Sequence, residues 1–175
     1  MQPTVKIDVS EATGVWETDG LPMVYVPRHF MLNIHNAVED ALGLSAYKSV
    51  LYDAGARAAY HWCKTQAENQ NLDGVRVFEH YLERLTARGW GQFQIVDIDP
   101  GASATITVKN SIYVLGGRPG PGHPVCYMFE GFFAGGFKYA SQHPGSAPGE
   151  MDCKEVECEA MGFDRCKFEL KTIPQ

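Results

Sequence analysis

The sequence CKEVECEAMGFDRCKFEL, residues 153–170, contains two short alternations of apolar and polar residues on either side of a Met-Gly-Phe-Asp turn. Alternation with a period of two is typical of β-strands that bury one face, and the glycine favours a tight turn between them. We therefore predict strands near 152–160 and 166–172 that pair as an antiparallel hairpin. This hairpin brings Cys158 and Cys166 opposite each other.

The text PVCYMFEGFFAGGF, residues 124–137, precedes this hairpin and is rich in aromatic residues. It predicts an apolar helix over about 125–141, because aromatic side chains recur in it at helical spacing. Gly131 and Gly135 lie four residues apart and so share one face of the helix. Without a Cβ on that face, the backbone of another element can approach closely.

The remaining sequence alternates between helical and extended patterns. Helices are expected over 27–42, 45–69 with Ser45 as N-cap, and 74–87, after short extended pieces in 5–26. A hairpin is expected over 91–98 and 102–108, around Asp99-Pro100-Gly101, and 111–115 either extends its second strand or starts a third. Because the turns are too short for parallel crossovers, the fold class is α+β, with helices packed on an antiparallel sheet.

Four residues form a candidate metal site: Cys126, Glu155, Cys158 and Cys166. The five cysteines are odd in number and four of them lie in the last third of the chain, a pattern that favours metal ligation over disulfides. Three thiolates and a carboxylate can bind Zn²⁺ tetrahedrally, and four protein ligands leave no open position for catalysis. The alternative is that these cysteines are small buried core residues.

The composition limits the classes of function. A formal charge of −6 without a run of basic residues argues against nucleic-acid binding, and no apolar stretch is long enough to span a membrane. Without an export signal we expect a cytoplasmic protein. There is no P-loop, G-x-G-x-x-G, G-x-S-x-G or H-E-x-x-H motif, so we assign no catalytic residue. We expect a single domain over 1–175, with an N-terminal extension over 1–26 and a zinc-binding region over 124–172.

Two motifs carry a resemblance to a known family. They are Pro124-Val-Cys-Tyr-Met-x-x-Gly-Phe-x-x-Gly-Gly-Phe and Glu155-x-Glu-Cys-x-Ala-x-Gly-x-x-x-Cys-x-Phe, with weaker matches at Gly14-Val-Trp and Leu51-Tyr-x-Ala-Gly. The sequence resembles the four-vinyl-reductase domain family, which includes sensor domains of phenol- and xylene-responsive activators and is distantly related to Golgi tethering-complex subunits. The resemblance implies the ligand-binding fold of the nitric-oxide-signalling and Golgi-transport type.

The resemblance implies that zinc is held by Cys126, Glu155, Cys158 and Cys166, although the apparently longer loop over 143–152 lets Cys153 compete as a ligand. It also implies an apolar pocket next to the metal, lined here by Phe93, Ile106, Val108 and Cys153. Val108 stands where the phenol sensors carry a tryptophan that reaches the ligand hydroxyl. We therefore expect an apolar or weakly polar ligand other than phenol.

Core packing remains the alternative for several residues at these positions. Phe129, Phe133 and Phe137 favour packing over ligand contact, and Trp90 either covers a pocket or caps the core. The sequence favours a binding or sensing module that forms a homodimer and acts through a partner protein, because no ATPase or helix-turn-helix segment follows. An accessory protein that holds the substrate of a partner enzyme, and a dimeric scaffold, are the alternatives. The absence of a nicotinamide or flavin motif argues against an independent reductase.

Overall fold

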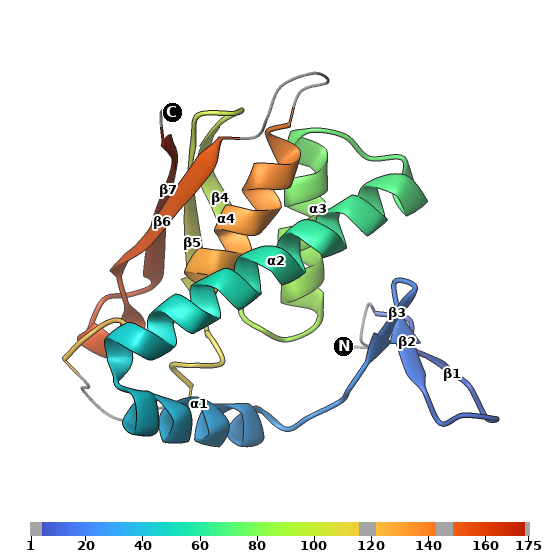
Figure 1. The fold of residues 1–175 in the computed structure, drawn as a ribbon, viewed down its shortest axis with the longest axis horizontal. Coiled ribbons are helices and arrows are strands. Elements are labelled where there is room, and N and C mark those ends of the chain that lie inside the picture. Colours follow the sequence, from blue (N-terminus) through green and yellow to red (C-terminus); the bar gives the residue numbers. More distant parts are fainter. Residues whose placement is uncertain (1–4, 116–121, 143–148, 174–175) are drawn as a thin grey trace.

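A four-stranded antiparallel sheet with helices on one face forms the main body of the chain (Figure 1). The computed structural model describes residues 5–115, 122–142 and 149–173. The strand order is β4 (Gln92–Asp99), β5 (Ser103–Lys109), β7 (Cys166–Ile173) and β6 (Glu150–Glu157). The helices are α1 (Arg28–Leu42), α2 (Leu44–Gln70), α3 (Val75–Ala87) and α4 (Met128–Ala140). This arrangement confirms the α+β class.

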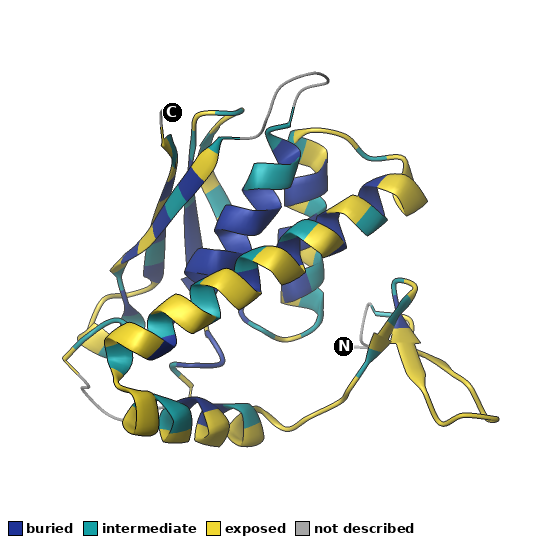
Figure 2. Cartoon of the chain, viewed as in Figure 1, coloured by how far each residue is buried: buried dark blue, intermediate teal, exposed yellow. Residues whose placement is uncertain are grey.

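Helix α4 lies at the centre of the molecule, between the sheet and α2 (Figure 2). Ten of its thirteen residues are buried, which fits a helix that is apolar on nearly every side. A Cβ at Gly131 would lie 2.3 Å from the carbonyl oxygen of Tyr52, and one at Gly135 would lie 2.0 Å from that of Ala56. The predicted close approach at these glycines is confirmed, and its partner is α2.

The inner face of the sheet packs against α4 through alternate residues of its strands. In β5 these are Ala104, Ile106 and Val108, and in β7 Cys166, Phe168 and Leu170. The register pairs Ile106 with Phe168 and Val108 with Cys166, so the two rows lie side by side. Period-two alternation in the sequence thus corresponds to one buried and one exposed face.

A small three-stranded sheet lies apart from the main body at the N-terminus (Figure 1). It consists of β1 (Asp8–Val9), β2 (Trp16–Thr18) and β3 (Leu21–Met23). Asp19, in the turn between β2 and β3, accepts hydrogen bonds from Arg84 at 2.7 and 2.9 Å and from Arg88 at 2.5 Å. One carboxylate therefore ties the N-terminal sheet to α3.

Two local expectations were wrong. Helix α2 begins at Leu44, with Gly43 rather than Ser45 at the cap position. Gly43 has φ of 80°, a conformation that suits glycine, so the chain turns there directly from α1 into α2. Residues 112–115 form a turn instead of a strand, with the Leu115 N–H donating to the Ser111 carbonyl at 3.0 Å. Most of the two predicted loops, 116–124 and 143–149, lies outside the described residues.

Among the helices in the described part of the chain, none has the length and apolarity that a membrane span requires.

Candidate metal centre

Four predicted ligands from separate elements converge at one end of the sheet. Cys126 lies just before α4, Glu155 lies in β6, Cys158 follows β6, and Cys166 is the first residue of β7. All four are buried, and the sulfur and carboxylate oxygen atoms that they offer lie within 4.8 Å of one another. Cys153 is not a member of this group, although it is buried on the same strand.

An irregularity in β6 explains how Glu155 and Cys158 reach the same place. Residues three apart on a regular strand point to opposite faces. The pairing of β6 with β7 shifts between Glu155 and Glu157, so Val156 is an additional residue in the strand. After this bulge the alternation is reversed, and Cys158 is buried like Glu155. The Glu-x-x-Cys spacing is thus accommodated by a β-bulge.

The distances between the sulfur atoms suit a shared cation. Cys126 Sγ lies 3.6 Å from Cys166 Sγ, which lies 3.8 Å from Cys158 Sγ. Zinc–sulfur bonds of about 2.3 Å at tetrahedral angles place two sulfur atoms about 3.8 Å apart. A disulfide requires about 2.05 Å, and all five cysteines are free thiols.

The carboxylate of Glu155 is positioned by the backbone. Its Oε2 atom accepts a hydrogen bond of 2.8 Å from the Cys126 N–H, while its Oε1 atom is buried and accepts none. A buried carboxylate oxygen that makes no hydrogen bond is costly unless it serves another purpose. Coordination of a metal ion is such a purpose, so the residues present fit a bound cation.

Charge within the cluster also favours a cation. Burial raises the pKa of Glu155 and the pKa of Cys126, because each deprotonation places a negative charge in a poorly solvated space. Hydrogen bonds from Cys126 and Cys166 lower the pKa of Cys158, so one thiolate is stabilised by its neighbours. Among the described residues, no lysine or arginine forms an ion pair with any of the four groups. A divalent cation would supply the missing positive charge.

Three residues that the sequence analysis did not identify support this site. Ser111 is fully buried and its Oγ lies 3.0 Å from Cys126 Sγ. Glu130, buried in α4, accepts hydrogen bonds through Oε1 from the Glu155 N–H at 2.9 Å and from Lys48 Nζ at 2.8 Å. Glu130 is the one acidic residue in an otherwise apolar, aromatic-rich segment, and that contrast could have revealed its role.

The four residues predicted to line a ligand pocket lie in the hydrophobic core or against it. Ile106 and Val108 are fully buried, Cys153 is 2% exposed, and Phe93 is partly buried. Phe93 packs against Phe129 with ring centroids 5.1 Å apart. The structure therefore brings these residues together on the inner face of the sheet, where aromatic rings pack closely around them.

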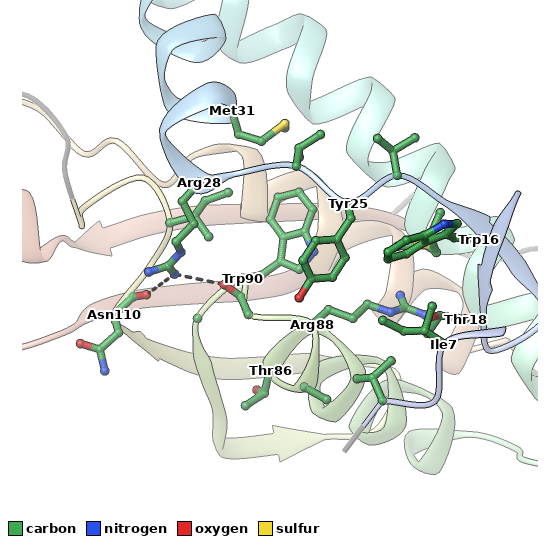
Figure 3. Close-up of a pocket in the computed structure, with 18 of the residues that line it drawn as sticks. Ile7, Trp16, Thr18, Tyr25, Arg28, Met31, Thr86, Arg88, Trp90 and Asn110 are labelled. Carbon is green, nitrogen blue, oxygen red and sulfur yellow. Dashed lines mark hydrogen bonds between the residues drawn. The ribbon is translucent and has the colours of Figure 1, made fainter. Parts of the chain in front are cut away.

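A cavity of about 710 Å³ lies elsewhere, between the N-terminal sheet and the main body (Figure 3). None of the four predicted lining residues contributes to its wall. Trp90 does, and its ring also packs on Phe132 at a centroid distance of 5.7 Å. Both alternatives for Trp90 thus hold together, since it covers the core and lines a cavity.

Comparisons with known proteins agree with this geometry. Residues 1–96 match the family described as Domain of unknown function (DUF5943), and residues 105–172 match the vinyl-4-reductase domain. No curated protein matches the chain.

Solved structures share the fold at low sequence identity. The phenol-responsive sensory domain of the transcription activator PoxR, solved with phenol, superposes with a TM-score of 0.78 at 14% identity, over 95% of this chain and 84% of that one. A vinyl-4-reductase family protein from Methanocaldococcus jannaschii gives 0.57 at 16% identity, over 87% and 85% of the two chains. A trafficking protein particle complex subunit 3 from Naegleria fowleri, covalently bound to palmitic acid, gives 0.58 at 11%, over 84% and 95%.

The expected resemblance is confirmed by the match over the region that contains all four candidate ligands. The chain belongs to the DUF5943 family and carries, in its C-terminal part, a domain of the vinyl-4-reductase type.

Proposed function

We propose that this protein is a small-molecule-binding or sensing module, folded as one domain, with a structural Zn²⁺ at Cys126, Glu155, Cys158 and Cys166. The observation that carries the metal assignment is the convergence of three thiols and one carboxylate within 4.8 Å at a buried point. Soft sulfur ligands select zinc over magnesium or calcium. Four protein ligands complete a tetrahedral shell, so the ion would stabilise the fold without binding a substrate.

The metal would join three parts of the chain that are separate in sequence. Cys126 holds the start of α4, Glu155 and Cys158 the end of β6, and Cys166 the start of β7. When bound, the ion supplies positive charge to the cluster and crosslinks these elements. Thiols stay reduced in the cytoplasm, which is therefore the compartment that we propose.

For the ligand we propose an apolar or weakly polar small molecule. The fold supports this proposal, because two proteins that share it are solved with phenol and with palmitic acid. Phe93, Ile106, Val108 and Cys153 stay the predicted lining of a core pocket. Because Ile106 and Val108 are fully buried by neighbouring side chains, a ligand there would require the core to open. We propose no chemistry on the ligand, and a partner protein to which binding is reported.

A homodimeric scaffold is the second candidate. Large apolar side chains are exposed on the N-terminal sheet, on α1 and on the segment between them, including Trp16, Tyr25, Phe30 and Ile34. An exposed apolar surface of this kind favours association with another protein. The closely packed interior favours this reading, since a scaffold needs no ligand pocket.

Native mass spectrometry of the freshly purified protein tests both candidates in one measurement. We expect one zinc ion per chain, a dimer near twice the chain mass of 19.4 kDa, and a co-purified small molecule that is released on collisional activation. Zinc and dimer without any ligand, followed by no binding in calorimetric titrations with phenols, alkylbenzenes and fatty acids, would favour the scaffold. Protein without metal that keeps its full thermal stability in a strong chelator would contradict the zinc assignment.

A further inference from the structure

The cavity beneath the N-terminal sheet has the size and lining of a ligand site. Its volume of about 710 Å³ falls within the range of small-molecule pockets, roughly 300–1,000 Å³. Three aromatic side chains contribute to the wall: Trp16 of β2, Tyr25 of the segment before α1, and Trp90 before β4. Met31 of α1 and Ile112 add apolar surface. An apolar body of drug-like size would therefore be buried well.

The charges around this cavity are unusual for the molecule. The chain has a formal charge of −6 with 21 acidic residues, yet no aspartate or glutamate among the described residues lines the cavity. Two arginines do, Arg28 and Arg88. Arg88 shares the carboxylate of Asp19 with Arg84, so one negative charge faces two positive charges there. The wall as a whole is thus positive, which favours an anionic group on the ligand.

Arg28 is held in place by neutral groups. Its Nη2 atom donates to the carbonyl oxygens of Gly89, at 3.1 Å, and Asn110, at 2.9 Å. These two bonds use one nitrogen of a guanidinium that carries five N–H donors. Within the described part of the chain, no carboxylate forms an ion pair with Arg28. The guanidinium is therefore oriented by the backbone while its charge is left for a ligand.

Figure 3 shows how these groups are distributed. Arg28 and Asn110 lie at one end of the cavity, Trp16 and Thr18 lie at the other, and the ring of Tyr25 lies between them. The polar and apolar parts of the wall are thus separated along its length. A ligand with a charged head and an apolar body matches this separation.

We infer that this cavity is a binding site for an amphipathic monocarboxylate, whose carboxylate pairs with Arg28 and whose apolar body packs against Trp16, Tyr25 and Trp90. The site is distinct from the predicted core pocket and from the metal centre. It goes beyond the proposed function, since it requires neither a bound zinc ion nor an opening of the core.

Calorimetric titration with 4-phenylbutyrate and its neutral analogue 4-phenyl-1-butanol tests the inference. We expect the carboxylate to bind at least about tenfold more tightly than the alcohol, because hydrogen bonds to charged groups are stronger than neutral ones. Arg28→Gln should remove this preference while leaving the weaker affinity for the alcohol, and Arg28→Lys should keep part of it. Tyr25→Ala should weaken both ligands, and its side chain is 79% exposed, so folding should tolerate the change.

Two controls match these variants. Arg76→Gln removes an exposed arginine outside the cavity, and Phe163→Ala removes an exposed aromatic side chain on another part of the molecule. Neither should change the affinity for 4-phenylbutyrate. Equal affinities for the acid and the alcohol, unaffected by Arg28→Gln, would overturn the inference.

Other outcomes separate this inference from the proposed function. If the affinity responds to Cys153→Ala and Phe93→Leu but not to Arg28 or Tyr25 variants, the ligand occupies the core and only this inference fails. If neither compound binds while Trp16→Ala and Tyr25→Ala weaken the dimer, the cavity is a surface for self-association, and the inference is wrong. Loss of zinc without loss of 4-phenylbutyrate binding would overturn the metal assignment alone.

Discussion

At the scale of single residues, the candidate centre depends on side chains that differ in what surrounds them. Cys158 and Cys153 are both buried thiols near the end of the chain, and they lie five residues apart. Cys158 has two sulfur neighbours and a carboxylate, whereas Cys153 lies in the hydrophobic core outside that cluster. The two therefore offer a matched test of metal ligation against packing.

Cys158→Ala should abolish zinc binding and lower the melting temperature, whereas Cys153→Ala should keep one zinc per chain. At free zinc 1,000 times above Kd, the ion contributes about 4 kcal/mol to the free energy of unfolding. Removing the Cys153 sulfur costs only a small packing term of about 1 kcal/mol. Elemental analysis and thermal denaturation measure both quantities. Equal zinc content in the two variants would show that Cys158 is not a ligand.

Glu130 acts on the centre through the backbone of Glu155, so we regard it as a positioning residue. Glu130→Ala removes the acceptor for the Glu155 N–H and for Lys48 Nζ, at a cost of about 1–3 kcal/mol. Loss of such supporting contacts typically weakens metal binding by about 10–100-fold. Glu130→Gln keeps an acceptor and should rescue most of the affinity.

The measurement for Glu130 is the rate of zinc release to a chromophoric chelator. Glu169→Ala is the control, because that side chain is exposed and pairs with Lys167 at 2.9 Å. A Glu130→Ala variant that releases zinc as slowly as the control would limit Glu130 to a role in stability.

At the scale of elements, the crossing of α2 over α4 determines the centre of the fold. Gly131 and Gly135 allow the backbone of α4 to lie against the carbonyl groups of Tyr52 and Ala56. Gly55 of α2 packs against Phe132 in the same contact, where a Cβ would lie 3.0 Å from the ring. Small residues on both helices thus bring the two backbones together, and α4 in turn carries Glu130 towards β6.

Gly135→Ala should destabilise the fold by at least about 1 kcal/mol, although alanine favours a helix by about 1 kcal/mol relative to glycine. The reason is that the new Cβ would lie 2.0 Å from a carbonyl oxygen of α2, which cannot move away without shifting the helix. Gly136→Ala is the control on the same helix. Its Cβ would meet only the side chains of Phe78 and Tyr81, at 3.1 Å, and these can adjust.

Urea denaturation of both variants tests this contact. The Gly135 variant should unfold at a clearly lower urea concentration than the Gly136 variant. Equal midpoints would mean that α2 can move away from α4 at little cost.

At the scale of the whole molecule, the N-terminal sheet is held to the body by a few polar contacts. Asp19 binds Arg84 and Arg88, and its carbonyl oxygen accepts a hydrogen bond of 2.9 Å from the Gln66 side chain. The three charged side chains are only 11–17% exposed. Arg88 also lies 5.3 Å above the ring of Trp62. Because the same contacts close the cavity, they connect ligand binding to the position of the N-terminus.

Asp19→Asn should loosen the N-terminal sheet without unfolding the body. Asn tolerates the positive φ of 56° at this position, so the change removes mainly the charge and weakens the bonds to both arginines, at about 1.5–3 kcal/mol. Chymotrypsin should then cleave faster after Tyr25, while the circular dichroism of the body stays unchanged. Asp73→Asn, in an exposed pair with Arg76, should have little effect. Equal cleavage rates would assign the attachment to apolar contacts instead.

Much of this description could be predicted from the sequence, because it depends on local pattern and residue chemistry. Period-two and period-3.6 patterns predicted the elements in order, with bounds mostly within a few residues of those observed. Thiols and a carboxylate have metal-binding chemistry wherever they lie, so Cys126, Glu155, Cys158 and Cys166 could be predicted as a set. Gly131 and Gly135 indicated a close contact, because only the absence of a Cβ permits one.

Only the tertiary structure decided which groups meet. The bulge at Val156 depends on pairing with β7, and the contact of Lys48 with Glu130 joins residues 82 positions apart, so neither has a local pattern. The predicted core pocket and the observed cavity differ for the same reason. The packing of α4 against the sheet decides how much space remains at Val108, and the attachment of Asp19 to α3 decides where the N-terminal sheet encloses a cavity. Such contacts are set by the packing of distant segments, which no local pattern encodes.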